Sequence, residues 1–111
     1  MGKYDVRYER ELRDIKTKEG WLIIRSAGSL KEDLIALKPK DHEIIEVKSV
    51  KSEVYYTTKD KEQFDSLNEL AKKGYNVFYY IRWKGKKSGK QWSRFKLPLA
   101  PYPVFKFEES N

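Results

Sequence analysis

The fold of this chain is decided by two stretches of its sequence, Asp33-Leu34-Ile35-Ala36-Leu37-Lys38 and Glu43-Ile44-Ile45-Glu46-Val47-Lys48. Both are short and rich in aliphatic and β-branched residues, so both predict β-strands. The four residues between them include a proline and an aspartate, which is typical of a hairpin turn. A hairpin brings Asp33 close to Glu46, and the two-residue period of a strand places Glu46 and Lys48 on the same face.

An acid and an amine are unusual inside the second strand, where Glu46 is flanked by Ile44, Ile45 and Val47. Burying them costs several kcal/mol unless they bind a ligand or each other. One interpretation is a divalent metal ion held by two carboxylates and a backbone carbonyl, with Lys48 beside the water or phosphate, as in phosphodiester hydrolysis. The alternative is an edge strand whose Glu46 and Lys48 face water as an ordinary ion pair.

The sequence before these strands predicts one helix and one further strand. Tyr8, Leu12 and Ile15 recur at helical spacing between charged residues, which predicts an amphipathic helix over residues 4–19 that is ended by a glycine. Residues 21–25 form a short apolar run that predicts a strand, and small residues then predict a tight loop.

The sequence after them predicts a second helix and two more strands. Thr57 or Thr58 can cap a helix that runs to Gly74, and residues 75–83 and 91–97 predict strands joined by a basic turn. The segment before this helix either extends the sheet or links irregularly. The predicted order of elements is therefore α-β-β-β-α-β-β.

Length and composition limit the kind of protein further. A chain of 111 residues predicts one domain, which we place at residues 1–97, with residues 98–111 as an extended or mobile tail. The absence of cysteine and the single histidine, His42, exclude disulfides, a thiolate nucleophile and His-rich metal sites, so a catalytic metal must be held by oxygen. We expect His42 to be a solvated loop residue.

The charge of the chain indicates its partner. Lys and Arg number 24 against 17 Asp and Glu, a net charge of +7, which points to a polyanion such as nucleic acid or an anionic membrane surface. The alternative is simple solubility, which is common among small basic proteins. No apolar run approaches the ~20 residues needed to cross a bilayer, and the first residues lack the apolar middle of a secretory signal. We therefore expect an intracellular, cytoplasmic protein with no membrane partner and no nucleotide cofactor, encoded by a cell or a virus.

Four motifs of the chain resemble a known family. They are Tyr8-Glu9-Arg10-Glu11-Leu12, Arg25-Ser26-Ala27-Gly28-Ser29, Asp33-Leu34-Ile35-Ala36 and Ile45-Glu46-Val47-Lys48. In this order and spacing they resemble the archaeal Holliday junction resolvases of the restriction-endonuclease-like PD-(D/E)XK nuclease superfamily. The resemblance covers roughly residues 4–97 and implies an α/β, restriction-endonuclease-like fold with a central mixed five-stranded sheet flanked by helices.

The resemblance also implies a catalytic site. Its metal ligands would be the carboxylates of Glu9, Asp33 and Glu46 and the carbonyl of Val47, and its cofactor Mg²⁺, with Mn²⁺ as a substitute. Lys48 would position the attacking water or stabilise the phosphorane. Ser29 would lie near the scissile phosphate, and two arginines would contact DNA or the catalytic loop, Arg10 and Arg25.

The function implied is that of a homodimeric endonuclease that resolves four-way DNA junctions by paired, metal-dependent cuts. A two-fold dimer suits a two-fold substrate. The alternatives are a nuclease of the same superfamily that acts on flaps, nicks or duplex DNA, and a DNA-binding module whose acidic cluster is structural.

Several of these residues have an ordinary structural interpretation as well. Glu9 could form a solvated pair with Arg13 one turn along the helix, and Arg25 could extend over the core. Three lysines are either solvated charges or grip a phosphate backbone, namely Lys51, Lys86 and Lys87. The apolar stripe of the second helix packs inward or forms part of a partner surface, and it consists of Phe64, Leu67 and Leu70.

Overall fold

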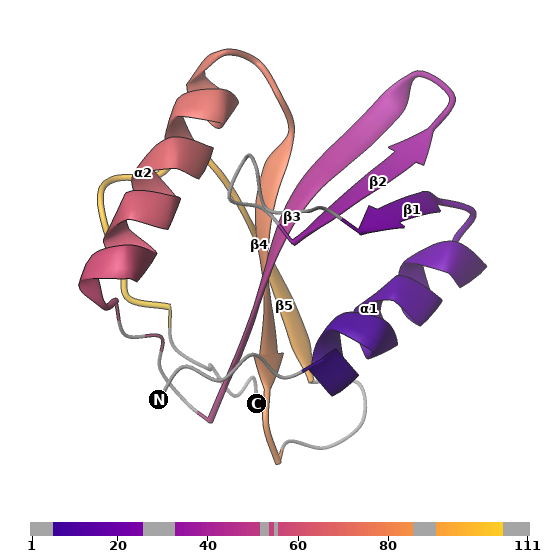
Figure 1. Ribbon diagram of the computed structural model, residues 1–111, viewed down its shortest axis with the longest axis horizontal. Helices are drawn as coiled ribbons and strands as arrows, with labels where there is room; N and C mark the ends of the chain where they lie inside the picture. Colours follow the sequence, from indigo (N-terminus) through magenta and orange to yellow (C-terminus); the bar gives the residue numbers. More distant parts are fainter. Residues whose placement is uncertain (1–5, 26–32, 52–53, 55, 86–90, 106–111) are drawn as a thin grey trace, which may run out of the picture.

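The computed structural model describes residues 6–25, 33–51, 54, 56–85 and 91–105. These residues contain α1 (Val6–Lys18), β1 (Leu22–Arg25), β2 (Leu34–Lys38), β3 (Asp41–Val50), α2 (Thr58–Lys72), β4 (Val77–Trp83) and β5 (Trp92–Lys96). The strands form one sheet in the order β1-β2-β3-β4-β5, as Figure 1 shows. The predicted α/β fold, a mixed five-stranded sheet flanked by helices in the order α-β-β-β-α-β-β, is confirmed. Neither described helix is long and apolar enough to cross a membrane.

The strand that carries Glu46 lies in the middle of the sheet. β3 pairs with β2 in antiparallel orientation and with β4 in parallel orientation. A parallel pair requires a crossover connection, and α2 supplies it. Because β3 pairs with two strands and Glu46 is only 4% exposed, the interpretation of Glu46 as a solvent-facing residue of an edge strand is wrong.

The two helices cover opposite faces of the sheet (Figure 1). Successive residues of β3 serve both faces, since Ile45 belongs to the core beneath α1 and Ile44 to the core beneath α2. Phe64 and Leu67 of α2 are fully buried, and Leu70 is partly buried against the same core. The stripe of α2 therefore packs inward.

Both helices begin at the end of the sheet where β3 and β4 finish (Figure 1). The start of α2 is fixed by a capping box, in which Thr57 Oγ1 accepts from the Asp60 amide and the Asp60 side chain accepts from the Thr57 amide. The turn after α1 contains Gly20 at a φ of 97°, a conformation that a glycine adopts without strain. This shared end of the sheet carries the positive ends of two helix dipoles.

The β2–β3 connection is shorter than the sequence predicts. The turn consists of Pro39 and Lys40 alone, with Lys40 at a φ of 65°, because β3 already begins at Asp41. His42 is consequently a half-buried strand residue whose Nε2 accepts from the Asn76 amide at 2.9 Å. The expectation of a solvated loop histidine is wrong, since the periodicity of a strand does not locate its first residue.

The chain after β5 joins the core. Residues 98–105 form no helix or strand, but Phe105 is buried and stacks on Phe95 with 4.3 Å between ring centroids. The Tyr56 hydroxyl donates to the Pro103 carbonyl at 2.7 Å. The expected surface-bound or mobile tail is thus anchored through residue 105, because its aromatic rings bury apolar area that no regular spacing reveals.

Candidate active site

Asp33 ties the start of β2 to the central strand. Its amide donates to the Ile45 carbonyl at 2.8 Å, and its Oδ2 accepts from the Val47 amide at 2.8 Å. Val47 lies beyond the last partnered residues of the two strands, Leu34 and Ile45, so the Asp33 side chain replaces the missing strand. The carbonyl of a strand residue points to the same side as its amide, so the Val47 carbonyl faces this side as well.

Glu46 and Lys48 occupy the α2 face of β3. Lys48 Nζ lies 3.6 Å from Glu46 Oε2, which confirms that the two side chains share a face. Glu46 is only 4% exposed, and within the described part of the chain its Oε1 is buried without a hydrogen-bond partner. A buried carboxylate oxygen without a donor is costly, so this position favours a ligand that brings positive charge.

The carboxyl groups of Glu46 on β3 and of Asp33 at the start of β2 both have a raised pKa, and burial is the largest cause in each. Burial raises the pKa of Glu46 well above its usual value, and the charge of Asp33 raises it further, while Lys48 opposes both. Burial also raises the pKa of Asp33, against the Val47 amide that stabilises its charged form. A cation between the two carboxylates would remove this repulsion.

Glu9 reaches the same region from α1. It is 1% exposed, and Arg25 Nε at the end of β1 donates to its Oε2 at 3.1 Å. The negative charge of Glu9 contributes to the raised pKa of Asp33. The interpretation of Glu9 as a solvated partner of Arg13 is therefore wrong. The fold brings together residues from α1, β1 and the start of β2 that lie far apart in sequence.

The donors fit a hard divalent cation in part. Within the described ranges, no group of three or more His, Asp or Glu side chains is arranged to hold a metal ion. Asp33 and Glu46 are nevertheless mutually repelling carboxylates beside the Val47 backbone, and Mg²⁺ binds readily through one or two carboxylates with water completing its shell. Glu9, which bonds Arg25, remains a predicted third carboxylate.

Comparison with known proteins identifies the family of the chain. Residues 3–100 match the family described as archaeal Holliday junction resolvase (Hjc). The chain belongs to this family.

Two members of the Hjc family illustrate the similarity. The chain is 42% identical over 64 residues to the crossover junction endodeoxyribonuclease Hjc of Methanocaldococcus jannaschii, a match that covers 57% of this chain and 48%, about half, of that relative. The structure of the present chain resembles that of Archaeoglobus fulgidus Hjc, a Holliday junction resolvase from an archaeal hyperthermophile. The TM-score is 0.60 and the sequence identity 27%, and the match covers 81% of this chain and 73% of that one.

Two residues that contact Lys48 at this candidate site were missed by sequence analysis. Lys48 Nζ donates to Asp60 Oδ1 at 3.0 Å and to Gln63 Oε1 at 3.1 Å, both on the first turns of α2. The Thr57-x-x-Asp60 spacing is a recognisable capping box. Nothing in the sequence shows, however, that the crossover brings this end of α2 over Lys48.

Among the predicted DNA-binding residues, Arg25 contacts Glu9. Arg10 on α1 and Lys51 after β3 are exposed. Ser29, Lys86 and Lys87 lie outside the described residues. The roles of these residues in the Hjc-family chain remain predictions.

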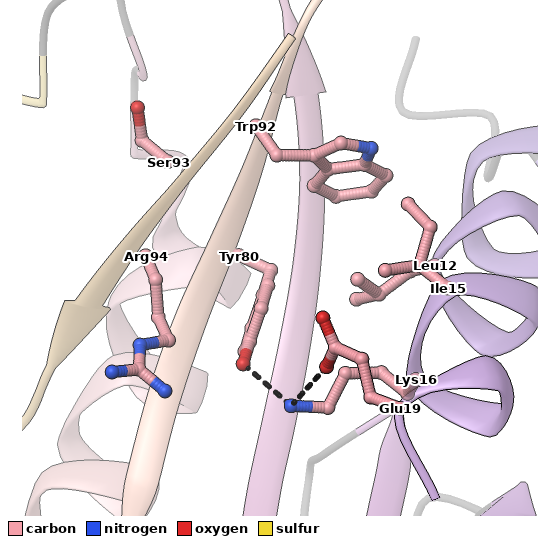
Figure 2. Close-up of a pocket in the computed structure, with 8 residues that line it drawn as sticks. All are labelled: Leu12, Ile15, Lys16, Glu19, Tyr80, Trp92, Ser93 and Arg94. Atoms are coloured by element: carbon pink, nitrogen blue, oxygen red, sulfur yellow. Dashed lines mark hydrogen bonds and ion pairs between the residues drawn. The ribbon is translucent and has the colours of Figure 1, made fainter. Parts of the chain in front are cut away.

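A second polar cluster lies between α1 and the strands β4 and β5 (Figure 2). Lys16 Nζ donates to Glu43 Oε1 at 2.7 Å and to the Tyr80 hydroxyl at 2.9 Å, beside a cavity of about 330 Å³. Arg94 bonds the other Glu43 oxygen at 3.0 Å. Glu19 Oε1 also lies 4.0 Å from Lys16 Nζ, so two cations meet two carboxylates, and we interpret the cluster as a structural part of the interface between helix and sheet.

Proposed function

We propose that the protein is a structure-selective endodeoxyribonuclease that resolves four-way DNA junctions by metal-dependent phosphodiester hydrolysis. One observation carries the proposal: Asp33, Glu46 and Lys48 lie close together at the start of β2, where the buried Glu46 Oε1 lacks a donor within the described residues. Membership of the Hjc family supports the choice of substrate. This function implies an intracellular location, because four-way DNA junctions occur inside cells.

In this proposal Asp33, Glu46 and the Val47 carbonyl hold Mg²⁺, with Mn²⁺ as a substitute, and Glu9 is the third carboxylate. The bound cation supplies an activated water and neutralises charge on the phosphate. The Lys48 ammonium is a compact charge with three donors, suited to orienting that water or to stabilising the phosphorane. Ser29 is proposed to contact the scissile phosphate.

The proposed enzyme is a homodimer that cuts two strands symmetrically. A closed two-fold assembly presents the same site twice, as a four-way junction requires. Binding would come mainly from phosphate contacts, for which we propose Arg10, Arg25 and three lysines, Lys51, Lys86 and Lys87. Selectivity would then come from the shape of the junction, not from its bases.

The test compares a synthetic four-way junction with linear duplex of the same sequence. We expect wild-type protein with Mg²⁺ to convert the junction into paired nicked duplexes and EDTA to stop the reaction. Asp33→Asn should bind the junction within about 3-fold of wild type and cut at least ~100-fold more slowly. Glu62→Gln, an exposed carboxylate on α2, is the matched control and should cut normally. A protein that neither prefers junctions nor cuts any DNA would refute the proposal.

The same assay separates the two alternatives. A nuclease for flaps, nicks or duplex DNA would cut one of those substrates faster than the junction. A DNA-binding module with a structural acidic cluster would bind DNA and cut none, and Asp33→Asn and Glu46→Gln would then leave its function unchanged.

A further inference from the structure

The first turns of α2 contact the side chain of Lys48 at two points. Lys48 Nζ donates to Asp60 Oδ1 at 3.0 Å and to Gln63 Oε1 at 3.1 Å, and Glu46 Oε2 lies 3.6 Å from the same ammonium. Asp60 and Gln63 are three residues apart and so lie on one face of the helix. Gln63 also opposes the rise in the pKa of Glu46 through side-chain hydrogen bonding.

Helix capping does not account for these contacts. Asp60 uses Oδ2 to accept from the Thr57 amide at 3.0 Å, which leaves Oδ1 for the lysine. Gln63 takes no part in the capping box. A cavity of about 200 Å³ adjoins the ammonium and is lined by Lys48, Lys59, Asp60 and Gln63. The lysine is therefore fixed on one side while space remains beside it.

We propose that Asp60 and Gln63 are positioning residues that hold the Lys48 ammonium beside Glu46 for phosphodiester hydrolysis, an inference that rests on the function proposed above. A free lysine side chain samples many rotamers, so fixing it before substrate arrives favours the reactive arrangement. Residues that orient a catalytic group in this way are typically worth about 10- to 100-fold in activity.

The test uses Asp60→Ala and Gln63→Met with two controls. Thr57→Ala removes a capping bond without touching Lys48, and Glu62→Met makes a like change on the exposed side of α2. We expect Asp60→Ala and Gln63→Met to slow single-turnover cleavage by about 10-fold or more, with junction affinity in EDTA within about 2-fold of wild type. Both controls should cut within about 2-fold of wild type.

A second readout does not depend on activity. The ammonium of Lys48, assigned by its loss in Lys48→Arg, should give a slowly exchanging NMR signal in the metal-free protein because it is hydrogen-bonded. Asp60→Ala and Gln63→Met should broaden or abolish this signal, and both controls should keep it. Wild-type cleavage in both variants, or an unchanged signal, would overturn the inference. If wild type cuts no DNA, the proposed function fails, while the signal still decides whether α2 holds Lys48.

Discussion

Glu46 carries a stability cost that depends on pH. Its pKa is raised well above the usual 4.5, first by burial and then by Asp33. Between the two pKa values the folded protein keeps a proton on Glu46 that the unfolded chain releases. The contribution of Glu46 to stability is therefore fully present below pH 4.5 and is lost as pH rises through its raised pKa. This cost is what a bound cation would offset.

Glu46→Gln should accordingly stabilise the metal-free protein. We expect its melting temperature in EDTA at pH 8 to exceed that of wild type by about 4 °C or more, which is roughly 1 kcal/mol in a domain of this size. The difference should vanish near pH 4. Glu62→Gln, at an exposed position, should show no such trend. A Glu46→Gln variant less stable than wild type at pH 8 would show that the carboxylate is stabilised by contacts other than a metal.

At the scale of elements, the sequence predicts which side chains share one face of a single strand or helix. The two-residue period of β3 placed Glu46 beside Lys48, and helical spacing identified the buried stripe of α2. The Glu9–Arg25 bond and the contacts of α2 with Lys48 were missed because each joins elements whose approach depends on the whole sheet. The packing of Phe105 was missed for the same reason.

Phe105→Ala tests whether the segment after β5 belongs to the core. Phe105 is 5% exposed and packs on Phe95 and Tyr79, so its loss should lower the free energy of unfolding by about 3 kcal/mol in urea denaturation. Val104→Ala, at a neighbouring side chain that is 61% exposed, should cost less than ~0.5 kcal/mol. Equal effects of the two substitutions would mean that the segment is not anchored in solution.

At the scale of the whole molecule, the charge of +7 predicts how DNA binding responds to salt. The logarithm of junction affinity should fall linearly with the logarithm of salt concentration, because phosphate contacts release counterions. Arg10→Ala and Lys51→Ala should each reduce this slope by about 1 in fluorescence titrations. Lys72→Ala, exposed at the far end of α2, should leave it unchanged. An unaltered slope in the first two variants would place the DNA on another surface.

The parallel pairing of β3 with β4 also bears on how the protein folds. A chain that has formed only the β1–β3 meander already carries Asp33, Glu46 and Lys48, but α2 must cross the sheet before β4 can pair. Pairing between strands that are far apart in sequence forms late in folding, because the entropy of closing the loop is lost before the new contacts stabilise the chain. The proposed hydrolytic activity should therefore arise with the final cooperative step of folding, so a partly folded chain would pose little danger to the DNA around it.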